Sequence, residues 1–215
     1  QEIISKIQFN CKLNFKNAID VNILLEAKGL DILEINKLIG AGIKKIGFNN
    51  LVEFAEVADF ILPVKKHYLG NLDSLNMNEV IEKFDLIESV NSLETARRLN
   101  DFCVRKGLVK KVLIQVNLLN NEKHFGLLPA EIFNNFIDLG KLGGLKVIGI
   151  SSYVPNYGKK SKEERVLRKI KTIYDLLSAR FRGIEVLSLN ALDNLENLIA
   201  EGVNEIRLGK SKLEN

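Results

Sequence analysis

The chain has 215 residues, the length of one domain, and hydrophobic and charged residues make up 46% and 27% of it. This balance is ordinary for a soluble globular protein with a sizeable core. The formal net charge of +4 comes from 31 basic and 27 acidic residues of interspersed sign, which argues against a nucleic-acid-binding protein. Two charged runs, residues 159–168 and 210–212, are expected to be solvated surface.

Cysteine content and hydropathy bear on where the protein works. Only Cys11 and Cys103 are present, too few for a disulfide framework or a thiolate metal site. No apolar run approaches the roughly 18 residues that span a bilayer, and residues 1–9 lack the basic-then-apolar pattern of a secretory signal. The sequence therefore predicts a cytoplasmic protein without a membrane partner.

Short apolar runs alternate with longer amphipathic segments, a pattern typical of βαβ units and a parallel sheet. The apolar runs predict strands at Asn22–Ala27, Lys45–Phe48, Lys66–Gly70, Leu86–Val90, Lys111–Leu118, Lys146–Ser151, Glu185–Leu189 and Glu205–Leu208. Eight strands in a chain of this length favour an α/β protein with a single (β/α)8 TIM barrel over residues 1–215 and no second β domain. Residues 1–20 are expected to form a helical segment packed on the barrel.

Capping residues mark where the helices between these strands start and stop. The capping-box spacing, a polar residue with Glu three positions later, occurs at Asp31/Glu34, Asn91/Glu94, Ser161/Glu164 and Asp193/Glu196. Pro129 suits a first helical turn, and left-handed C-caps are predicted at Gly42, Gly107 and Gly202.

Active sites of such barrels lie at the carboxyl ends of the strands. An inward-pointing Lys28 would be partly desolvated, with its amine usable for a Schiff base; alternatively, it extends from the barrel mouth into solvent. Arg207, inside an apolar strand, needs either a buried ligand or a neighbouring acid as its partner. The other polar residues at strand ends are Asn49, Gly70, Asn117, Ser151, Ser188 and Asn190.

The two histidines predict no metal site, because neither has a visible acidic cluster or a cysteine beside it. His67 lies within a predicted strand, where a hydrogen-bonded core residue is the ordinary alternative to a general base. His124 lies in a loop, either as a substrate contact or as plain surface. The sequence contains no Walker loop, dinucleotide-binding glycine fingerprint or nucleophile elbow.

Nine short segments, taken in order, resemble the strand-end motifs of the pyridoxal phosphate homeostasis family, which is related to the alanine racemase N-terminal domain and has the fold type III barrel. They are LLEAKGLD, IKKIGFNN, HYLGNL, LIESVNS, VLIQVNL, FGL, VIGIS, VLSLNALDN and EGVNEIRLGKS. Each segment is weak alone, whereas the ordered set is specific and covers about residues 21–211.

The resemblance implies that Lys28 is the catalytic residue and holds pyridoxal 5'-phosphate (PLP) as a Schiff base. Arg207 takes the place facing the pyridine nitrogen, where a cation keeps that nitrogen unprotonated and weakens the cofactor as an electron sink. Further cofactor contacts are implied at Asn49, His67, Ser188, Asn190, Gly209 and Lys210.

The function implied is that of a cofactor carrier in vitamin B6 and amino-acid homeostasis, without robust catalytic activity. A related racemase would also need a second base, generally from a further β domain. If the chain is an enzyme, it is a PLP-dependent, racemase-like isomerase. The expected partners are the cofactor and amino acids, and the expected state is a monomer or weak homodimer.

The sequence departs from the family pattern in the phosphate-binding segment. The glycine and second serine of that motif are lost between Leu187 and Asp193, Lys210 replaces a threonine, and His124 replaces a lysine. A lost hydroxyl removes a directed hydrogen bond. A second interpretation is therefore a degenerate, non-catalytic barrel with weak or no PLP binding, and a third is an enzyme for another small phosphorylated or amino-acid substrate.

Overall fold

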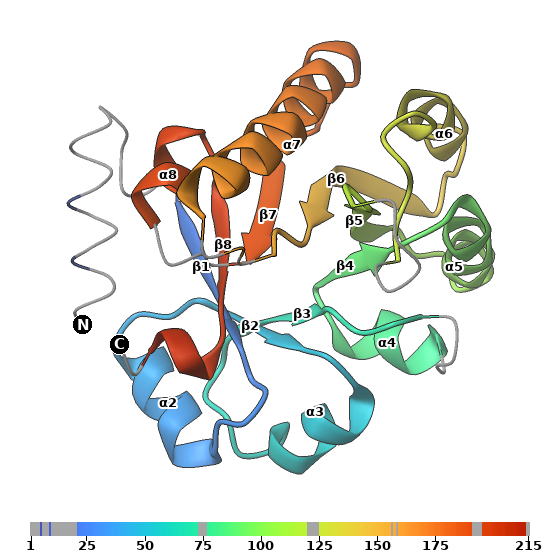
Figure 1. The fold of residues 1–215 in the computed structure, drawn as a ribbon. Helices are drawn as coiled ribbons and strands as arrows, with labels where there is room; N and C mark the ends of the chain where they lie inside the picture. The colour runs from blue at the N-terminus through green and yellow to red at the C-terminus, as the bar shows by residue number, and fades with distance from the viewer. Residues whose placement is uncertain are drawn as a thin grey trace.

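The computed structural model describes Ser5, Phe9 and residues 21–72, 77–119, 125–155, 157, 159–190 and 195–213. Eight parallel strands close into a barrel in sequence order, so that β1 pairs with both β2 and β8 (Figure 1). The strands are β1 (Asn22–Glu26), β2 (Lys45–Phe48), β3 (Lys65–Tyr68), β4 (Leu86–Val90), β5 (Lys110–Val116), β6 (Leu145–Ser152), β7 (Val186–Asn190) and β8 (Glu205–Leu208). The predicted fold class is confirmed. The segment at residues 1–20 lies outside the described residues, apart from Ser5 and Phe9.

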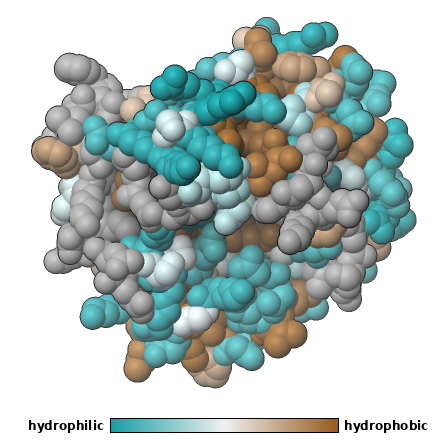
Figure 2. Space-filling model, in the orientation of Figure 1, coloured by the Kyte–Doolittle hydropathy of each residue, from teal (hydrophilic) through white to brown (hydrophobic). Residues whose placement is uncertain are grey.

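Helices follow the strands and surround the barrel, as Figure 1 shows. They are α2 (Ile32–Gly40), α3 (Leu51–Val57), α4 (Met77–Lys83), α5 (Leu93–Arg105), α6 (Ile132–Leu139), α7 (Lys160–Arg180) and α8 (Leu195–Ala200), with a 3-10 helix η2 (Lys210–Lys212) after the last strand. Among the described residues, no helix is both long and apolar enough to cross a membrane. Hydrophilic side chains cover much of the face drawn in Figure 2, with hydrophobic ones in smaller groups between them.

The main hydrophobic core lies between the strands and the helices around them. Every residue of β4 is buried. On α5, Ala96, Leu99 and Cys103 are buried at helical spacing and form the stripe that faces the sheet. Burying a side chain such as Leu99 stabilises the fold by roughly 1.5–3 kcal/mol. Amphipathic stripes of this kind therefore hold the surrounding helices against the barrel.

Local capping predictions are confirmed at the first of these helices and at three glycines. The Asp31 side chain accepts from the backbone N–H of Glu34, and the Glu34 side chain accepts from the N–H of Asp31, which completes a capping box. The predicted glycine stops have positive φ angles at Gly42, Gly107 and Gly202.

At α5 the predicted cap is wrong by one residue. Ser92, rather than Asn91, is the N-cap, and its hydroxyl accepts from the backbone N–H of Thr95. Asn91 is buried instead, where its side-chain oxygen accepts from the Thr95 hydroxyl at 3.1 Å. Both residue types favour cap positions, so local sequence could not choose between them.

Two further helix starts also differ from the prediction. Lys159 precedes α7 without a side-chain cap, so Ser161 lies inside the helix rather than at its cap. Pro129 lies in the turn before α6, which begins only at Ile132. The predicted cap at Asp193 lies outside the described residues.

Gly70 permits the chain segments after β2 and β3 to lie side by side. A β-carbon on Gly70 would lie 2.0 Å from the carbonyl oxygen of Asn49 and 2.5 Å from the Tyr68 hydroxyl. The Ser89 hydroxyl donates to the Gly70 carbonyl at 2.5 Å. Only a glycine fits this approach, which brings Asn49 and Leu69 to one edge of the barrel.

Candidate functional site

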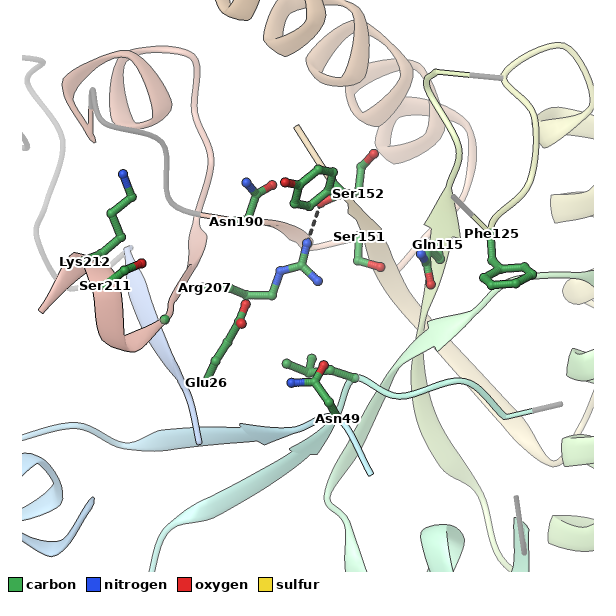
Figure 3. Close-up of a pocket in the computed structure, with 13 residues that line it drawn as sticks. Glu26, Asn49, Gln115, Phe125, Ser151, Ser152, Asn190, Arg207, Ser211 and Lys212 are labelled. Carbon is green, nitrogen blue, oxygen red and sulfur yellow. Dashed lines mark hydrogen bonds between the residues drawn. The ribbon is translucent and has the colours of Figure 1, made fainter. Parts of the chain in front are cut away.

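The carboxyl ends of the strands surround a cavity of about 440 Å³, here called the mouth cavity (Figure 3). This is where (β/α)8 barrels carry their sites, and the size suits a small molecule. Its walls are formed by Glu26, Asn49, Leu69, Gln115, Phe125, Ser151, Ser152, Tyr153, Asn190, Arg207, Gly209, Ser211 and Lys212.

Arg207 extends from β8 into this cavity. One Nη nitrogen donates to the backbone carbonyl of Ser152, drawn as the dashed line in Figure 3. The Nε nitrogen is buried without a hydrogen-bond partner, and Arg207 forms no direct ion pair within the described part of the chain. A buried donor without a partner costs free energy, so this guanidinium has capacity left for a ligand.

Asn190 and Ser152 fix the part of the wall that the ends of β7 and β6 form. The Asn190 side chain accepts from the N–H of Val154 at 2.7 Å and donates to its carbonyl at 2.8 Å. The Ser152 hydroxyl donates to the carbonyl of Val116 at 2.8 Å. These side chains hold the ends of β5, β6 and β7 together, and Asn190 therefore shapes the cavity through the backbone.

Glu26 is an acid in the cavity wall that sequence reasoning missed. It lies on β1 two residues after the buried Leu24, and its carboxylate comes within 3.8 Å of where a β-carbon on Gly209 would be. The available signal was an acid in the apolar run Ile23–Ala27. Because β1 pairs with β8, Glu26 and Arg207 bring opposite charges to neighbouring strands of one cavity.

The two predicted lysines lie outside the cavity wall. Lys28 is exposed in the turn that follows β1. The Lys210 ammonium donates to both carboxylate oxygens of Glu34 and to the carbonyl of Gly29, each at 3.0 Å. The pKa of Glu34 is lowered, first by the hydrogen bond from the Asp31 backbone and then by Lys210. Lys210 thus joins the segment after β8 to the start of α2.

Five inward-facing polar residues form a second group, here called the core cluster: Lys45, His67, Glu88, Ser188 and Glu205. His67 Nδ1 lies 2.6 Å from one Glu88 oxygen, and the Ser188 hydroxyl donates to the other at 2.7 Å. Lys45 forms an ion pair with Glu205. Apart from Lys45, which is 17% exposed, these side chains are less than 4% exposed.

The core cluster lies one layer below the mouth cavity, toward the amino ends of the strands. Ser188 pairs in register with Glu205, and Asn190 pairs with Arg207 two residues further along. Alternate residues of a strand share a face, so Glu205 and Arg207 face the same side at successive levels. The structure therefore separates His67 and Ser188 from Asn49, Asn190, Arg207 and Gly209, which line the mouth cavity.

Burial and charge act in opposite directions on the two core carboxyls. Burial raises the pKa of Glu88, but the hydrogen bond from His67 and the charges of His67 and Arg207 outweigh it and lower that pKa. For Glu205, burial and the Glu88 charge raise the pKa despite His67 and Lys45. The positive charges of His67 and Arg207 thus outweigh burial at Glu88, whereas those of His67 and Lys45 do not outweigh it at Glu205.

The sequence did not show that His67 would meet two acids. Glu88 and Glu205 lie 21 and 138 positions from it and approach only because β3, β4 and β8 face one interior. Their signal was a charged residue in the middle of a strand, which is unusual without a partner. His124, the other candidate, lies outside the described residues.

The closed barrel and its mouth cavity define a (β/α)8 fold with a cavity of small-molecule size. The chain belongs to the family of the alanine racemase N-terminal domain, whose model matches residues 25–211. Two curated relatives are named pyridoxal phosphate homeostasis protein. The one from Escherichia coli (strain K12) is 26% identical over 197 residues, covering 88% of this chain and 83% of the relative. The one from Haemophilus influenzae is 25% identical over 213 residues, with 96% and 90% covered.

Solved structures show the same fold. A structure described as an unknown protein from Bifidobacterium adolescentis has a TM-score of 0.88 and 25% identity, covering 98% of this chain and 91% of that one. PipY of Synechococcus elongatus, solved with PLP bound, has a TM-score of 0.78 and 24% identity, with 96% and 99% covered. An alanine racemase of Clostridium difficile has a TM-score of 0.75 and 19% identity, with 96% of this chain but 55% of the racemase covered.

Proposed function

We propose that this chain binds PLP in the mouth cavity, holds it as a Schiff base on Lys28, and acts as a cofactor carrier in vitamin B6 and amino-acid homeostasis. The observation that carries the proposal is the partly buried Arg207, whose Nε lacks a partner in a cavity of ligand size. The names of the relatives and the PLP bound by PipY indicate the chemical class of the ligand.

The residues present fit an anionic aromatic ligand. Arg207 and Lys212 bring positive charge to the cavity, and Ser211 adds a hydroxyl. Leu69, with Phe125 or Tyr153, offers apolar surface to a ring. When bound, PLP supplies an aldehyde that condenses with an amine, while the protein supplies position and charge.

Lys28 follows the cavity-lining face of β1. Glu26 lines the cavity, and residues two apart in a strand share a face. Lys28 comes two positions later, in the turn after β1, and its flexible four-carbon side chain gives its amine reach toward the cavity. Beneath the cavity, His67 and Ser188 contact Glu88 and are not among the residues of the cavity wall.

A second candidate, a barrel with weak or no PLP binding, is favoured by two observations. The Glu26 carboxylate lies next to Gly209, where it would repel a phosphate bound by that backbone. The Lys210 ammonium is held by Glu34 and Gly29 at the start of α2. Both features reduce the positive charge available in the segment after β8.

The test is titration of the protein with PLP, followed by its absorption, then borohydride reduction and peptide mapping. A saturable band with the reduced adduct on Lys28 supports the carrier. Lys28→Ala should abolish the band, whereas Lys37→Ala, on the exposed face of α2, should leave it unchanged. A parent protein without a band, or with adducts scattered over surface lysines, would support the second candidate instead.

A further inference from the structure

We propose that His67, Glu88 and Glu205 form a binding site for one divalent transition-metal ion of the zinc class in the barrel interior. The site lies below the mouth cavity and is independent of PLP. One ligand atom from each of the three residues lies within 4.8 Å of the others, and all three side chains are buried. They come from β3, β4 and β8, so the ion would join three strands of the barrel.

The first support is an oxygen that has no partner. Glu205 is 1% exposed, and its Oε1 forms no hydrogen bond, although Lys45 contacts the other oxygen. This Oε1 lies 3.9 Å from His67 Nδ1, on the same ring nitrogen that contacts Glu88. Buried carboxylate oxygens are ordinarily satisfied, so the vacant acceptor points to a cation between Glu205, His67 and Glu88.

The second support is the spacing of the ligand atoms. Zinc lies about 2.0–2.2 Å from nitrogen and oxygen ligands, which places neighbouring ligand atoms about 3.0–3.5 Å apart. Here Nδ1 is 2.6 Å from the Glu88 oxygen and 3.9 Å from the Glu205 oxygen. Opening the first contact and closing the second, each by less than about 1 Å, reaches that geometry.

The third support is that an outer group already orients each carboxylate. Ser188 donates to Glu88 Oε2 at 2.7 Å, and Lys45 holds Glu205 Oε2. Outer-shell donors of this kind fix first-shell ligands and are a regular part of metal sites. Each acid therefore presents one oxygen to the proposed ion and keeps the other for the protein.

The ligand set also restricts the kind of ion. One imidazole and two carboxylates suit zinc, cobalt or ferrous iron, whereas magnesium and calcium prefer oxygen ligands alone. Lys45 and Arg207 bring positive charge nearby and reduce affinity for a cation.

Titration with cobalt(II), followed by its visible absorption, tests this site on the complete chain. We expect a saturable one-to-one d–d band that zinc displaces, without a thiolate charge-transfer band. Glu205→Gln keeps the side-chain shape and should weaken cobalt binding at least tenfold. The matched control, Glu163→Gln, changes a glutamate that is also buried, on α7, and should bind as the parent does.

A readout that requires no variant is X-ray absorption of the zinc-loaded protein, which should show nitrogen and oxygen ligands only. The proposal fails if the parent gives no one-to-one band, if sulfur appears among the ligands, or if Glu205→Gln binds cobalt like the parent. None of these outcomes depends on PLP.

Discussion

Polar side chains inside this barrel occur at two levels that differ in how completely the protein itself satisfies them. In the core cluster, Lys45, Ser188 and His67 are each paired with an acid, and one carboxylate oxygen of Glu205 stands without a hydrogen bond. In the mouth cavity, Arg207 retains a buried donor without a partner and the space is open. The lower level is thus filled by its own hydrogen bonds and ion pairs, apart from the Glu205 oxygen at the proposed metal site, whereas the upper level has open space for a larger ligand.

The largest expected effect on the free energy of unfolding comes from removing an acid of the core cluster. Glu88→Ala leaves His67 and Ser188 without their acceptor inside the barrel, and removing one partner of a buried charged pair costs about 3–5 kcal/mol. Urea unfolding of metal-free protein measures the loss. Glu79→Ala, which breaks an exposed pair with Lys83 on α4, is the control and should be close to the parent. A Glu88→Ala protein as stable as the parent would contradict the role given to the core cluster.

Removing the close approach at Gly70 should have the next largest effect on the free energy of unfolding. Gly70→Ala places a β-carbon 2.0 Å from a backbone oxygen, and relieving such a clash costs roughly 1–3 kcal/mol. The matched control is Gly143→Ala, where a β-carbon meets nothing within 4 Å. Chemical unfolding compares the two. Equal stability of both variants would show that the segments after β2 and β3 are not closely packed.

A substitution in the mouth cavity should affect PLP binding more than stability. Arg207→Lys keeps the charge but loses the planar guanidinium, and PLP affinity should fall about tenfold, or ~1.4 kcal/mol. Arg182→Lys, at an exposed turn position, should bind like the parent. Absorbance titration gives the affinities. If Arg207→Lys lowered stability without changing affinity, Arg207 would belong with the structural level.

The smallest expected effect is on the ionisation of Tyr68 at alkaline pH. Burial raises the pKa of Tyr68 from 10.0 to about 12, so folding favours the protonated phenol. The stability that this contributes is complete below pH 10 and is lost as the pH rises through 12. Ultraviolet difference spectra should show a late-ionising tyrosine in the parent that is missing in Tyr68→Phe. An unchanged titration curve in that variant would contradict the assignment.

The order of strands could be predicted because it depends on local pattern. Runs such as Leu86–Val90 and Lys45–Phe48 are short, with apolar residues on both sides of polar or small ones, and the structure confirms them as strands. The start of α5 could not be fixed to one residue from the sequence, because Asn91 and Ser92 are both favourable N-caps. In the structure the backbone N–H of Thr95 donates to Ser92, which makes Ser92 the N-cap.

The arrangement of the site was less predictable. Asn49, directly after β2, and Arg207, inside β8, both line the mouth cavity. By contrast, Ser188 meets Glu88 across 100 positions of sequence, a contact that depends on strand register and barrel closure. The side chain of Lys210 was expected near a ligand, but its direction depends on Glu34, a partner 176 positions away.

Closure between β1 and β8 has a consequence for how the chain folds. Asn22 pairs with Glu205, and Leu25 pairs with Leu208, so these are the ladder contacts with the greatest separation in sequence. Contacts of this kind form late because a long loop must close first. Until β8 is in place, the edges of β1 and β7 remain open to pairing with other chains. The contact of Lys210 with Glu34 and Gly29 at this seam should therefore act on the rate of the final folding step and on aggregation during refolding.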